Sequence, residues 1–589
     1  MKDHVCAIDF GTTHTILGYY DHQLQKAVLI KQGKWAAKGQ VPYLLPSVVG
    51  WFGDHFEVGQ IAINADWDLT HNVYHLKDLI GKPYQYQFYN QNQQLQSCDL
   101  IYLISVLFLH LLKVAKNHFG QPVQKVVLSV PAYFHQNQIA IVEQAAALAG
   151  WKVLKIFFEP VCAASYYHHY LNANDQGDFK KTLIIDLGGG TLDLIIGTNH
   201  LQYFEPIRMG GKLSLGGKDW DDVIAQWLYQ SIQSRYQIDL TNNLFLKRQI
   251  HDIAKNVKEQ LSFQHQVAFK INGLYDDKHV NIVAEFCLDR EHLVQLSTHL
   301  HDHFRNAIMH LCDGMLDQIE QVFLVGGAMK MPTLQAIVNQ LFLKKPKLID
   351  QPELVVIYGM CAWLKDFIAN QEQVIVKPLI NLPIGVAINN NHFAILIKAH
   401  QPLPISCSRI FQTKQAGQNI AKIQIAQGIS ADFQQNHLLG VFLMQDLALN
   451  QALVHNQIKL TINVDLNYQA NLVVENLQTG YYQKLPLKNP YRYWESQFML
   501  DYLKQNQIQA ANQIVALEQL DYHLKQLHSQ LSQLVNDQFY LEQSQDLISE
   551  ALVAINQNDL KQIKALNDAI NKQIEANQKW VEHRQSISD

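Results

Sequence analysis

One stretch, residues 183–193 with the sequence LIIDLGGGTLD, restricts the possible fold more than any other part of the chain. Its apolar residues are followed at once by glycines, which is typical of a buried strand that ends in a tight loop. Because glycine adopts backbone angles closed to other residues, the consecutive N–H groups of residues 188–190 can converge on an anion. Asp186 is placed to hold a metal ion through water, and the Thr191 hydroxyl can face a phosphate or an attacking water. The alternative is an ordinary glycine-rich hairpin turn.

A similar pattern opens the chain and a related one follows much later. Residues 5–13 (VCAIDFGTT) run from an apolar strand through Asp9 to a glycine and two threonines. Residues 322–331 (VFLVGGAMKM) place two glycines after an apolar strand, which would suit close approach of backbone to an adenosine or a phosphate. The two strand–acid–glycine–threonine loops predict two similar lobes that each lend a loop to one nucleotide. No G-x-x-x-x-G-K-[ST] sequence occurs, so none of these loops is a Walker A motif.

Length, charge and cysteine usage narrow the class of protein. A chain of 589 residues has room for several domains, and a formal charge of −5 gives no electrostatic case for nucleic acid. The seven cysteines form no C-x-x-C pair, which favours a reducing compartment and buried thiols. The first apolar strand starts by residue 5, leaving no room for a signal peptide, and every run of roughly 18 apolar residues has polar breaks. We therefore expect a cytoplasmic protein with neither nucleic acid nor membrane as a partner.

Periodicity divides the rest of the chain into three parts. Residues 1–372 alternate strand-like and helix-like segments, which predicts an α/β domain with helices on its sheets. Short alternating apolar and polar runs from residue 384 to residue 475 predict a β-sandwich. From Trp494 onward there is no proline, and apolar residues recur every three or four positions, which predicts helices. A leucine seam within residues 517–534 would suit a two-stranded coiled coil, but breaks in the pattern favour a compact bundle.

Several segments together resemble one known family. They are AIDFGTT (7–13), HLKDLIG (75–81), LSVPAYF (128–134), FEPVCAA (158–164), DLGGGTLD (186–193), SLGGKDWD (214–221) and LVGGAMKMP (324–332). In order and spacing they look like the ATPase domain of heat-shock protein 70 chaperones, and the resemblance covers nearly the whole chain. It implies an actin-like α/β ATPase domain of two similar lobes (1–372), a linker (373–383), a β-sandwich that binds substrate (384–494) and an α-helical bundle as a lid (495–589).

The resemblance also implies ligands and residue roles. The cofactors would be ATP or ADP and Mg²⁺, with K⁺ as a further candidate. Asp9 and Asp186 would hold the Mg²⁺ through its waters, and the catalytic residues would be Lys77, Glu159, Thr191 and Asp193. The nucleotide would contact Gly11, Thr12, Thr13, Gly188, Gly189, Gly190, Thr191, Lys258, Ser262, Gly326 and Gly327. An ordinary salt bridge is the alternative role for Lys77 and Glu159.

The sequence departs from the family pattern mostly at positions that contact partners. Lys155 and Lys377 stand where the family usually has an arginine and an aspartate that connect J-domain co-chaperones to hydrolysis. Asn389 and Lys414 replace an apolar pair over the bound peptide, and Glu259 replaces an arginine that stacks on adenine. We therefore expect an atypical bacterial-type chaperone that binds client polypeptide, with weakened J-domain coupling and with a nucleotide exchange factor as a candidate partner. The alternatives are a nucleotide-responsive binding module with negligible turnover and a small-molecule kinase of the actin-like fold.

Overall fold

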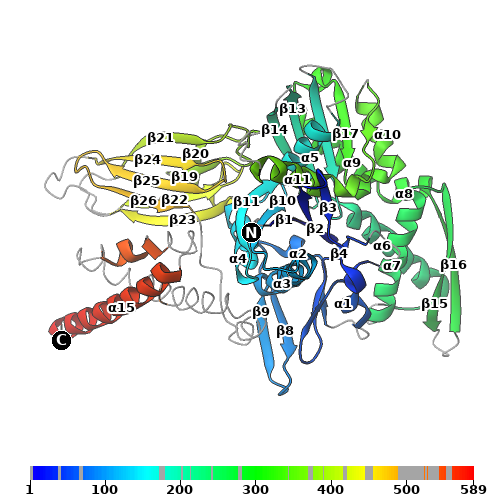
Figure 1. Ribbon diagram of the computed structural model, residues 1–589, viewed down its shortest axis with the longest axis horizontal. Helices are drawn as coiled ribbons and strands as arrows, with labels where there is room; N and C mark the ends of the chain where they lie inside the picture. The colour runs from blue at the N-terminus through cyan, green and yellow to red at the C-terminus, as the bar shows by residue number, and fades with distance from the viewer. Residues whose placement is uncertain are drawn as a thin grey trace.

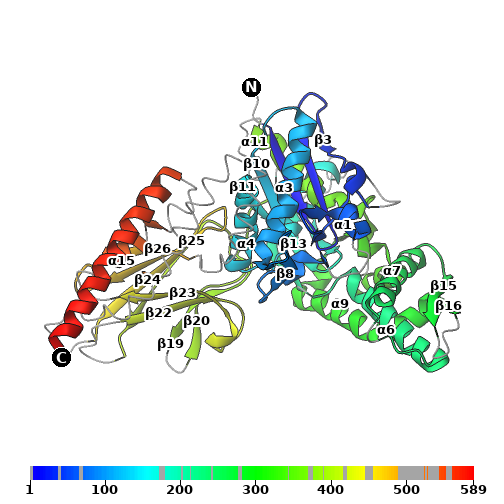
Figure 2. The same cartoon turned by 90° about the horizontal axis from the view of Figure 1, so that it is seen from below.

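The computed structural model describes most of the chain up to residue 487 and parts of the remainder (Figures 1 and 2). The described residues are 4–37, 42–65, 71–171, 180–200, 203–212, 214–240, 243–275, 281–342, 344–368, 376–388, 391–414, 421–444, 455–487, 523, 527, 543–548, 550–551 and 560–588. The predicted boundaries at residues 372 and 494 fall outside these ranges. So do Asn389 and all leucines of the predicted seam except Leu527, which is buried.

Two sheets in the first part of the chain share a pattern of strand pairing. The first has the order β11-β10-β1-β2-β3, and the second has the order β14-β13-β12-β17-β18. In each, a strand that ends in a predicted loop pairs in parallel with one neighbour and antiparallel with the next strand along the chain. The strands of the first sheet are β1 (Val5–Phe10), β2 (His14–Asp21), β3 (Lys26–Leu29), β4 (Leu45–Pro46), β10 (Lys125–Val130) and β11 (Lys152–Phe158). Those of the second are β12 (Lys181–Leu187), β13 (Leu192–Asn199), β14 (Phe204–Lys212), β17 (Gln321–Val325) and β18 (Lys347–Leu348).

Helices cover these sheets as the alternating pattern predicts. They are α1 (Gly59–Ala65), α2 (Leu76–Leu79), α3 (Leu100–Phe119), α4 (Gln136–Leu148), α5 (Glu159–Tyr166), α6 (Gly217–Tyr236), α7 (Leu244–Leu261), α8 (Arg290–Leu296), α9 (Thr298–Leu311), α10 (Pro332–Leu341) and α11 (Val355–Ile368). Smaller sheets are formed by β5 (Val49–Trp51), β6 (Phe56–Val58) and β7 (Asn72–Val73), by β8 (Gln85–Tyr89) and β9 (Leu95–Asp99), and by β15 (Gln266–Tyr275) and β16 (Asn281–Asp289). Glu159 begins α5 directly after β11.

Helix α3 is the one helix among the described residues that is long and apolar enough to cross a membrane. Asp99 caps its N-terminus by accepting a hydrogen bond from the Ile101 N–H, and Gly120 ends it in a left-handed conformation. Of its most apolar window, 72% is buried inside the protein. Phe108 packs edge-on against Phe10 of β1, with ring centroids 5.2 Å apart. The apolar composition of α3 is therefore explained by its place in the core beside the first sheet.

Two four-stranded antiparallel sheets follow, and they lie beside β11 and α4 in Figures 1 and 2. One contains β19 (Ile384–Ile388), β20 (His392–Ile397), β22 (Ala421–Gln427) and β23 (His437–Met444). The other contains β21 (Ile405–Gln412), β24 (Gln457–Val464), β25 (Ala470–Asn476) and β26 (Tyr482–Pro486). These C-terminal sheets share one cluster of buried apolar residues with the first sheet, whereas most of α6–α10 packs around a second cluster. The described part of the predicted helical tail includes α15 (Leu560–Ser588).

Helices α5 and α11 pack against each other between the first two sheets. Helix α11 contacts β1 and β2, and α5 contacts β12 and β13. Gly359 of α11 makes this approach possible, because a Cβ atom at that position would lie only 1.9 Å from the Cys162 carbonyl oxygen of α5. Since α5 begins with Glu159, this close contact helps fix a predicted catalytic residue.

We expect Gly359→Ala to separate α5 from α11 and to lower the free energy of unfolding by about 1–3 kcal/mol, the usual cost of overpacking a core. Urea unfolding of the purified variant measures this difference. Gly327→Ala is the matched control, because a Cβ at Gly327 would meet no heavy atom within 4 Å. Equal stabilities of the two variants would contradict the proposed tight contact.

Candidate functional site

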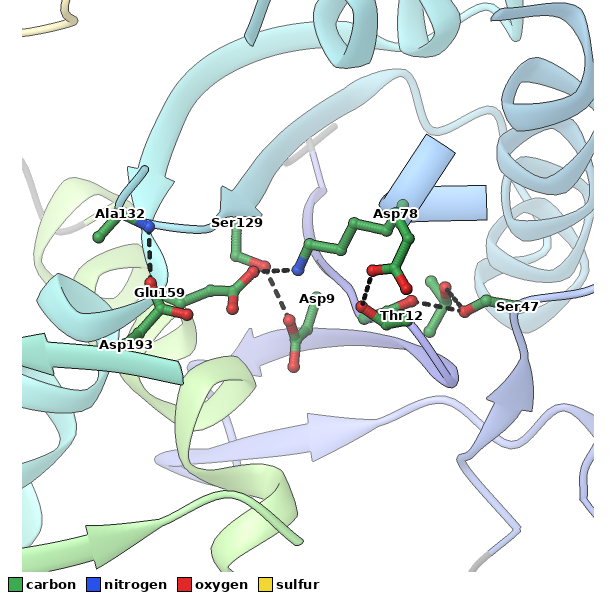
Figure 3. Close-up of polar contacts among 11 residues, drawn as sticks. Asp9, Thr12, Ser47, Asp78, Ser129, Ala132, Glu159 and Asp193 are labelled. Carbon is green, nitrogen blue, oxygen red and sulfur yellow. Dashed lines mark hydrogen bonds and ion pairs between the residues drawn. The ribbon is translucent and has the colours of Figure 1, made fainter. Parts of the chain in front are cut away.

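Four carboxyl groups and one lysine gather where the central strands of the two sheets end. Figure 3 labels three of the carboxyl groups, Asp9, Glu159 and Asp193. Asp9 comes from β1, and Asp186 pairs across the hairpin with Asp193 of β13. Glu159 begins α5, and Lys77 lies in α2. All except Asp9 are at least nine-tenths buried. The structure therefore brings the sequence-predicted metal-binding and catalytic residues together, although they come from distant parts of the chain.

Lys77 is the cation at the centre of this group. Its Nζ contacts Glu159 Oε1, and only 3% of the Lys77 side chain is exposed. Burial by itself would lower the pKa of Lys77, but the charges of Glu159 and Asp9 and the hydrogen bond to Glu159 outweigh it, and the net shift is upward. Lys77 therefore remains charged. The Lys77–Glu159 salt bridge considered from the sequence does exist, but it is buried and has further carboxyl groups close to it.

Asp193 is held by the backbone of another segment. The Ala132 N–H donates to Asp193 Oδ1 at 2.7 Å, and the Thr191 side chain is a second hydrogen-bond partner. Burial and then the charge of Glu159 raise the pKa of Asp193 to about 8, although the Ala132 hydrogen bond and Lys77 act in the opposite direction. A carboxyl group with a pKa near neutrality is suited to exchange a proton with a neighbouring water.

Asp9 and Asp186 carry the features of a site that needs a cation. Burial and then Glu159 raise the pKa of Asp9 to about 6, while Lys77 and a 2.7 Å hydrogen bond from Ser129 Oγ act against that shift. Burial, Glu159 and Asp193 raise the pKa of Asp186 well above its usual range. Carboxylate oxygens suit Mg²⁺, which usually keeps several of its waters. No group of three or more His, Cys, Asp or Glu side chains in the described ranges is arranged to hold an ion directly. The carboxyl chemistry of Asp9 and Asp186 fits Mg²⁺ that keeps its waters.

The two predicted phosphate loops touch each other. A Cβ atom at Gly189 would lie 2.1 Å from Thr13 Oγ1, and one at Gly190 would lie 2.7 Å from Thr12 Oγ1. The second loop is also a hairpin turn, since the Gly188 N–H donates to the Thr191 carbonyl at 3.0 Å. The hairpin alternative thus describes the local geometry correctly without excluding an anion site.

The N-terminus of α6 anchors the second loop. The Gly217 and Lys218 N–H groups each donate, at 2.9 Å, to the carbonyls of Gly188 and Gly189 respectively. The Lys218 side chain forms an ion pair with Asp78 of α2, and Thr12 Oγ1 donates to the other Asp78 oxygen at 3.3 Å. Asp78 and Lys218 therefore connect the first loop to the second, a contact that crosses between the two hydrophobic clusters.

The residues expected on the adenosine side are only partly gathered. Lys258 donates to the Gly217 carbonyl and pairs with Asp221, both at 2.7 Å, so it lies at the start of α6. Ser262 follows at the end of α7, where its hydroxyl donates to the Lys258 carbonyl at 3.5 Å. A Cβ atom at Gly326 would lie 2.5 Å from Asp186 Oδ1, which places that glycine against the Asp186 carboxyl group. Gly327 has open space around it.

Several residues of the site were not identified from the sequence. Ser129, the Ala132 N–H and Asp78 contact predicted site residues directly, and the Lys218 N–H donates to the Gly189 carbonyl. Ser47 was not predicted as a site residue either, although its hydroxyl donates to the Gly11 carbonyl at 2.7 Å. Four of these five residues lie inside the segments that carried the family resemblance, and that position could have identified them as site residues. Ser47 had no such signal.

We expect Asp193→Asn to change how stability depends on pH. Between its usual pKa of 3.8 and about 8, the folded protein keeps the Asp193 proton that the unfolded chain loses, so this group's contribution to stability falls as pH rises through that window. An asparagine has no such titration. The stability of the variant relative to wild type should therefore rise from pH 5 to pH 8 in urea unfolding without nucleotide. The control, Asp317→Asn at an exposed position, should follow wild type, and a parallel profile for Asp193→Asn would contradict the proposed environment.

Comparison with known proteins gives a consistent result. The sequence model of the family described as Hsp70 protein matches residues 5–587. A chaperone protein DnaK from Mycoplasmopsis agalactiae is 27% identical over 582 residues, which cover 97% of this chain and 94% of that protein. DnaK from Ureaplasma urealyticum is 26% identical over 595 residues (99% and 94%), and DnaK from Metamycoplasma hominis is 27% identical over 492 residues (83% and 80%). Because the family match extends over almost the entire sequence, the chain belongs to the Hsp70 family.

Proposed function

We propose that this Hsp70-family chain is an ATP-dependent chaperone that hydrolyses ATP at the site around Lys77. The observation that carries the proposal is the buried Lys77–Glu159 pair lying beside Asp193 and next to two glycine–threonine loops in contact. A fixed cation in a water-poor site stabilises charge that develops on a transferred phosphoryl group.

The residue roles follow from this arrangement. Bound Mg²⁺ would neutralise phosphate charge, and Asp9 and Asp186 would hold this ion through its water ligands. The backbone N–H groups of the two loops would face the phosphates, and Lys258 with residues 326–327 would face the nucleoside. Glu159 and Asp193, with Thr191 bound to Asp193, would orient the attacking water and accept its proton.

The domain organisation is part of the proposal. The matching strand patterns of the first two sheets and their two hydrophobic clusters support an actin-like ATPase domain of two lobes over residues 1–372. After a linker at 373–383, the C-terminal sheets would form the client-binding β-sandwich of residues 384–494, with a helical lid in residues 495–589. ATP binding would favour an open sandwich and hydrolysis a closed one, as a shift between two populations. We place the protein in the cytoplasm.

Partner coupling would be weaker than is usual in the family. The Lys155 ammonium lies over the rings of Phe157 and Trp363, 5.0 and 5.3 Å from their centroids, and burial lowers its pKa. Lys377 Nζ lies 5.6 Å from the centroid of the Tyr203 ring. A lysine also lacks the planar fork with which arginine binds a carboxylate. A J-domain co-chaperone would therefore stimulate hydrolysis only weakly, while a nucleotide exchange factor would act by opening the two lobes.

We expect the wild-type protein to hydrolyse ATP in steady state and to change its rate when client peptide is added. We expect Lys77→Ala to slow single-turnover hydrolysis by about 10²–10³, while ATP binding stays within a few-fold of wild type. The loss follows from removing one fixed charge next to the reacting group. An unchanged single-turnover rate would refute this role. Negligible wild-type turnover with intact binding would support the alternative, a nucleotide-responsive module for one partner. Stimulation by a sugar instead of a peptide would indicate a small-molecule kinase.

The Asp78–Lys218 pair should control how fast nucleotide leaves, because it connects two loops that must separate for release. We expect Lys218→Ala to speed dissociation of a fluorescent ADP analogue about tenfold, the usual effect of losing one charge-assisted contact. Exchanging the charges, with Asp78→Lys and Lys218→Asp together, should restore slow release. Lys270→Ala, which breaks an exposed pair with Glu285, serves as the control. If the exchanged variant releases ADP as fast as Lys218→Ala, the ion pair is not the cause.

A further inference from the structure

The segment between β10 and α4, residues 131–135, together with the first residues of α4, contacts both the catalytic group and the C-terminal sheets. On one side the Ala132 N–H holds Asp193. On the other, the carbonyl oxygens of Ala132 and Phe134 face Asn381, which precedes β19. A single residue, Ala132, thus has its N–H on a catalytic carboxyl group and its carbonyl on the C-terminal part of the chain. Any shift of this segment changes the support of Asp193.

Asn381 is bound on all sides by hydrogen bonds. Its amide nitrogen donates to the Ala132 and Phe134 carbonyls, each at 2.9 Å. Its oxygen accepts from Gln427 Nε2 at 3.2 Å, and Gln427 Oε1 accepts from the Gln136 N–H at 3.0 Å. Gln427 is 1% exposed, so water cannot readily replace these contacts. The result is a closed ring of hydrogen bonds that begins and ends on the same segment.

Tyr468, in the turn between β24 and β25, holds the same segment from a second sheet. Its backbone is left-handed, with φ 60°, a conformation that side-chain-bearing residues rarely adopt. In this conformation its carbonyl accepts from Gln136 Nε2 at 2.8 Å, and its buried ring packs edge-on against Phe158, with centroids 4.5 Å apart. Phe158 immediately precedes Glu159. Backbone strain of this kind persists where the surroundings fix it, and here the surroundings are the segment and the end of β11.

We propose that Asn381 is a positioning residue for ATP hydrolysis: by clamping the carbonyls of Ala132 and Phe134 it fixes the Ala132 N–H that orients Asp193. The inference rests on the role proposed above for Asp193 on the attacking water. Gln427 and Tyr468, which both bind Gln136, hold the C-terminal sheets against the same segment.

The test uses the full-length chain and single-turnover hydrolysis of Mg²⁺·ATP. Asn381→Asp keeps the size of the side chain but removes the two donated hydrogen bonds, and Asn381→Ala removes the side chain. We expect both to slow hydrolysis about three- to tenfold, with the ATP dissociation constant within twofold of wild type, because a displaced catalytic group affects the chemical step. Hydrogen–deuterium exchange over residues 128–136 should rise in both variants. Asn463→Ala, at an asparagine whose side chain donates to Asn471 Oδ1 across the β24–β25 hairpin, should leave the rate unchanged.

A double variant distinguishes the role of Asn381 from the role of Asp193. If Asn381 acts through Asp193, then Asn381→Asp combined with Asp193→Asn should be no slower than Asp193→Asn alone. A wild-type rate for Asn381→Asp, or a further full loss in the double variant, would overturn the proposal while leaving the role of Asp193 intact. A wild-type rate for Asp193→Asn would instead overturn the role proposed for Asp193, and this inference with it. Urea unfolding of each variant establishes that the compared proteins are folded.

Discussion

The structure depends on one buried cation, Lys77, among carboxyl groups that repel one another. Glu159 contacts it directly, and Asp9 and Asp193 lie close enough to shift its pKa. Burying charges of one sign costs folding free energy unless each charge is paired, hydrogen-bonded or protonated. The site shows all three arrangements. Glu159 is paired, Asp193 accepts a backbone hydrogen bond, and the pKa of Asp186 is raised. Such a group lowers the stability of the fold. The proposed binding of a metal ion and a polyphosphate would explain why the group is present.

The two sheets are brought together so that this group can form. Helices α5 and α11 meet through Gly359, and the loops meet through Gly189 and Gly190, where no Cβ atom would fit. The C-terminal sheets share the hydrophobic cluster of the first sheet, and their polar contacts converge on the segment that supports Asp193. Packing and the proposed chemistry therefore use the same few elements, and in our proposal these contacts let a distant part of the chain position Asp193.

Sequence reasoning worked best where a local pattern has one structural meaning. The strands that end in glycine loops at residues 5–13, 183–193 and 322–331 were predicted, because periodicity and turn residues act locally. It was weaker for contacts made only by the fold, such as Ser47 on Gly11 or the Ala132 N–H on Asp193. A backbone donor carries no sequence signal, and neither does a left-handed tyrosine at position 468. The predicted domain boundaries remain predictions, since residues 372 and 494 lie outside the described ranges.

The central claim is that the Lys77–Glu159 pair is present for hydrolysis and not for stability. Single-turnover ATP hydrolysis by the double variant Lys77→Met with Glu159→Gln, shown by urea unfolding to be folded, tests it most directly. Replacing both partners of a buried ion pair is often neutral or stabilising, so the variant should unfold at a urea concentration equal to or above that of wild type. Its hydrolysis should nevertheless be slower by a factor of about 10² or more. Hydrolysis within a few-fold of the wild-type rate would show that the pair is an ordinary structural salt bridge and would contradict the account.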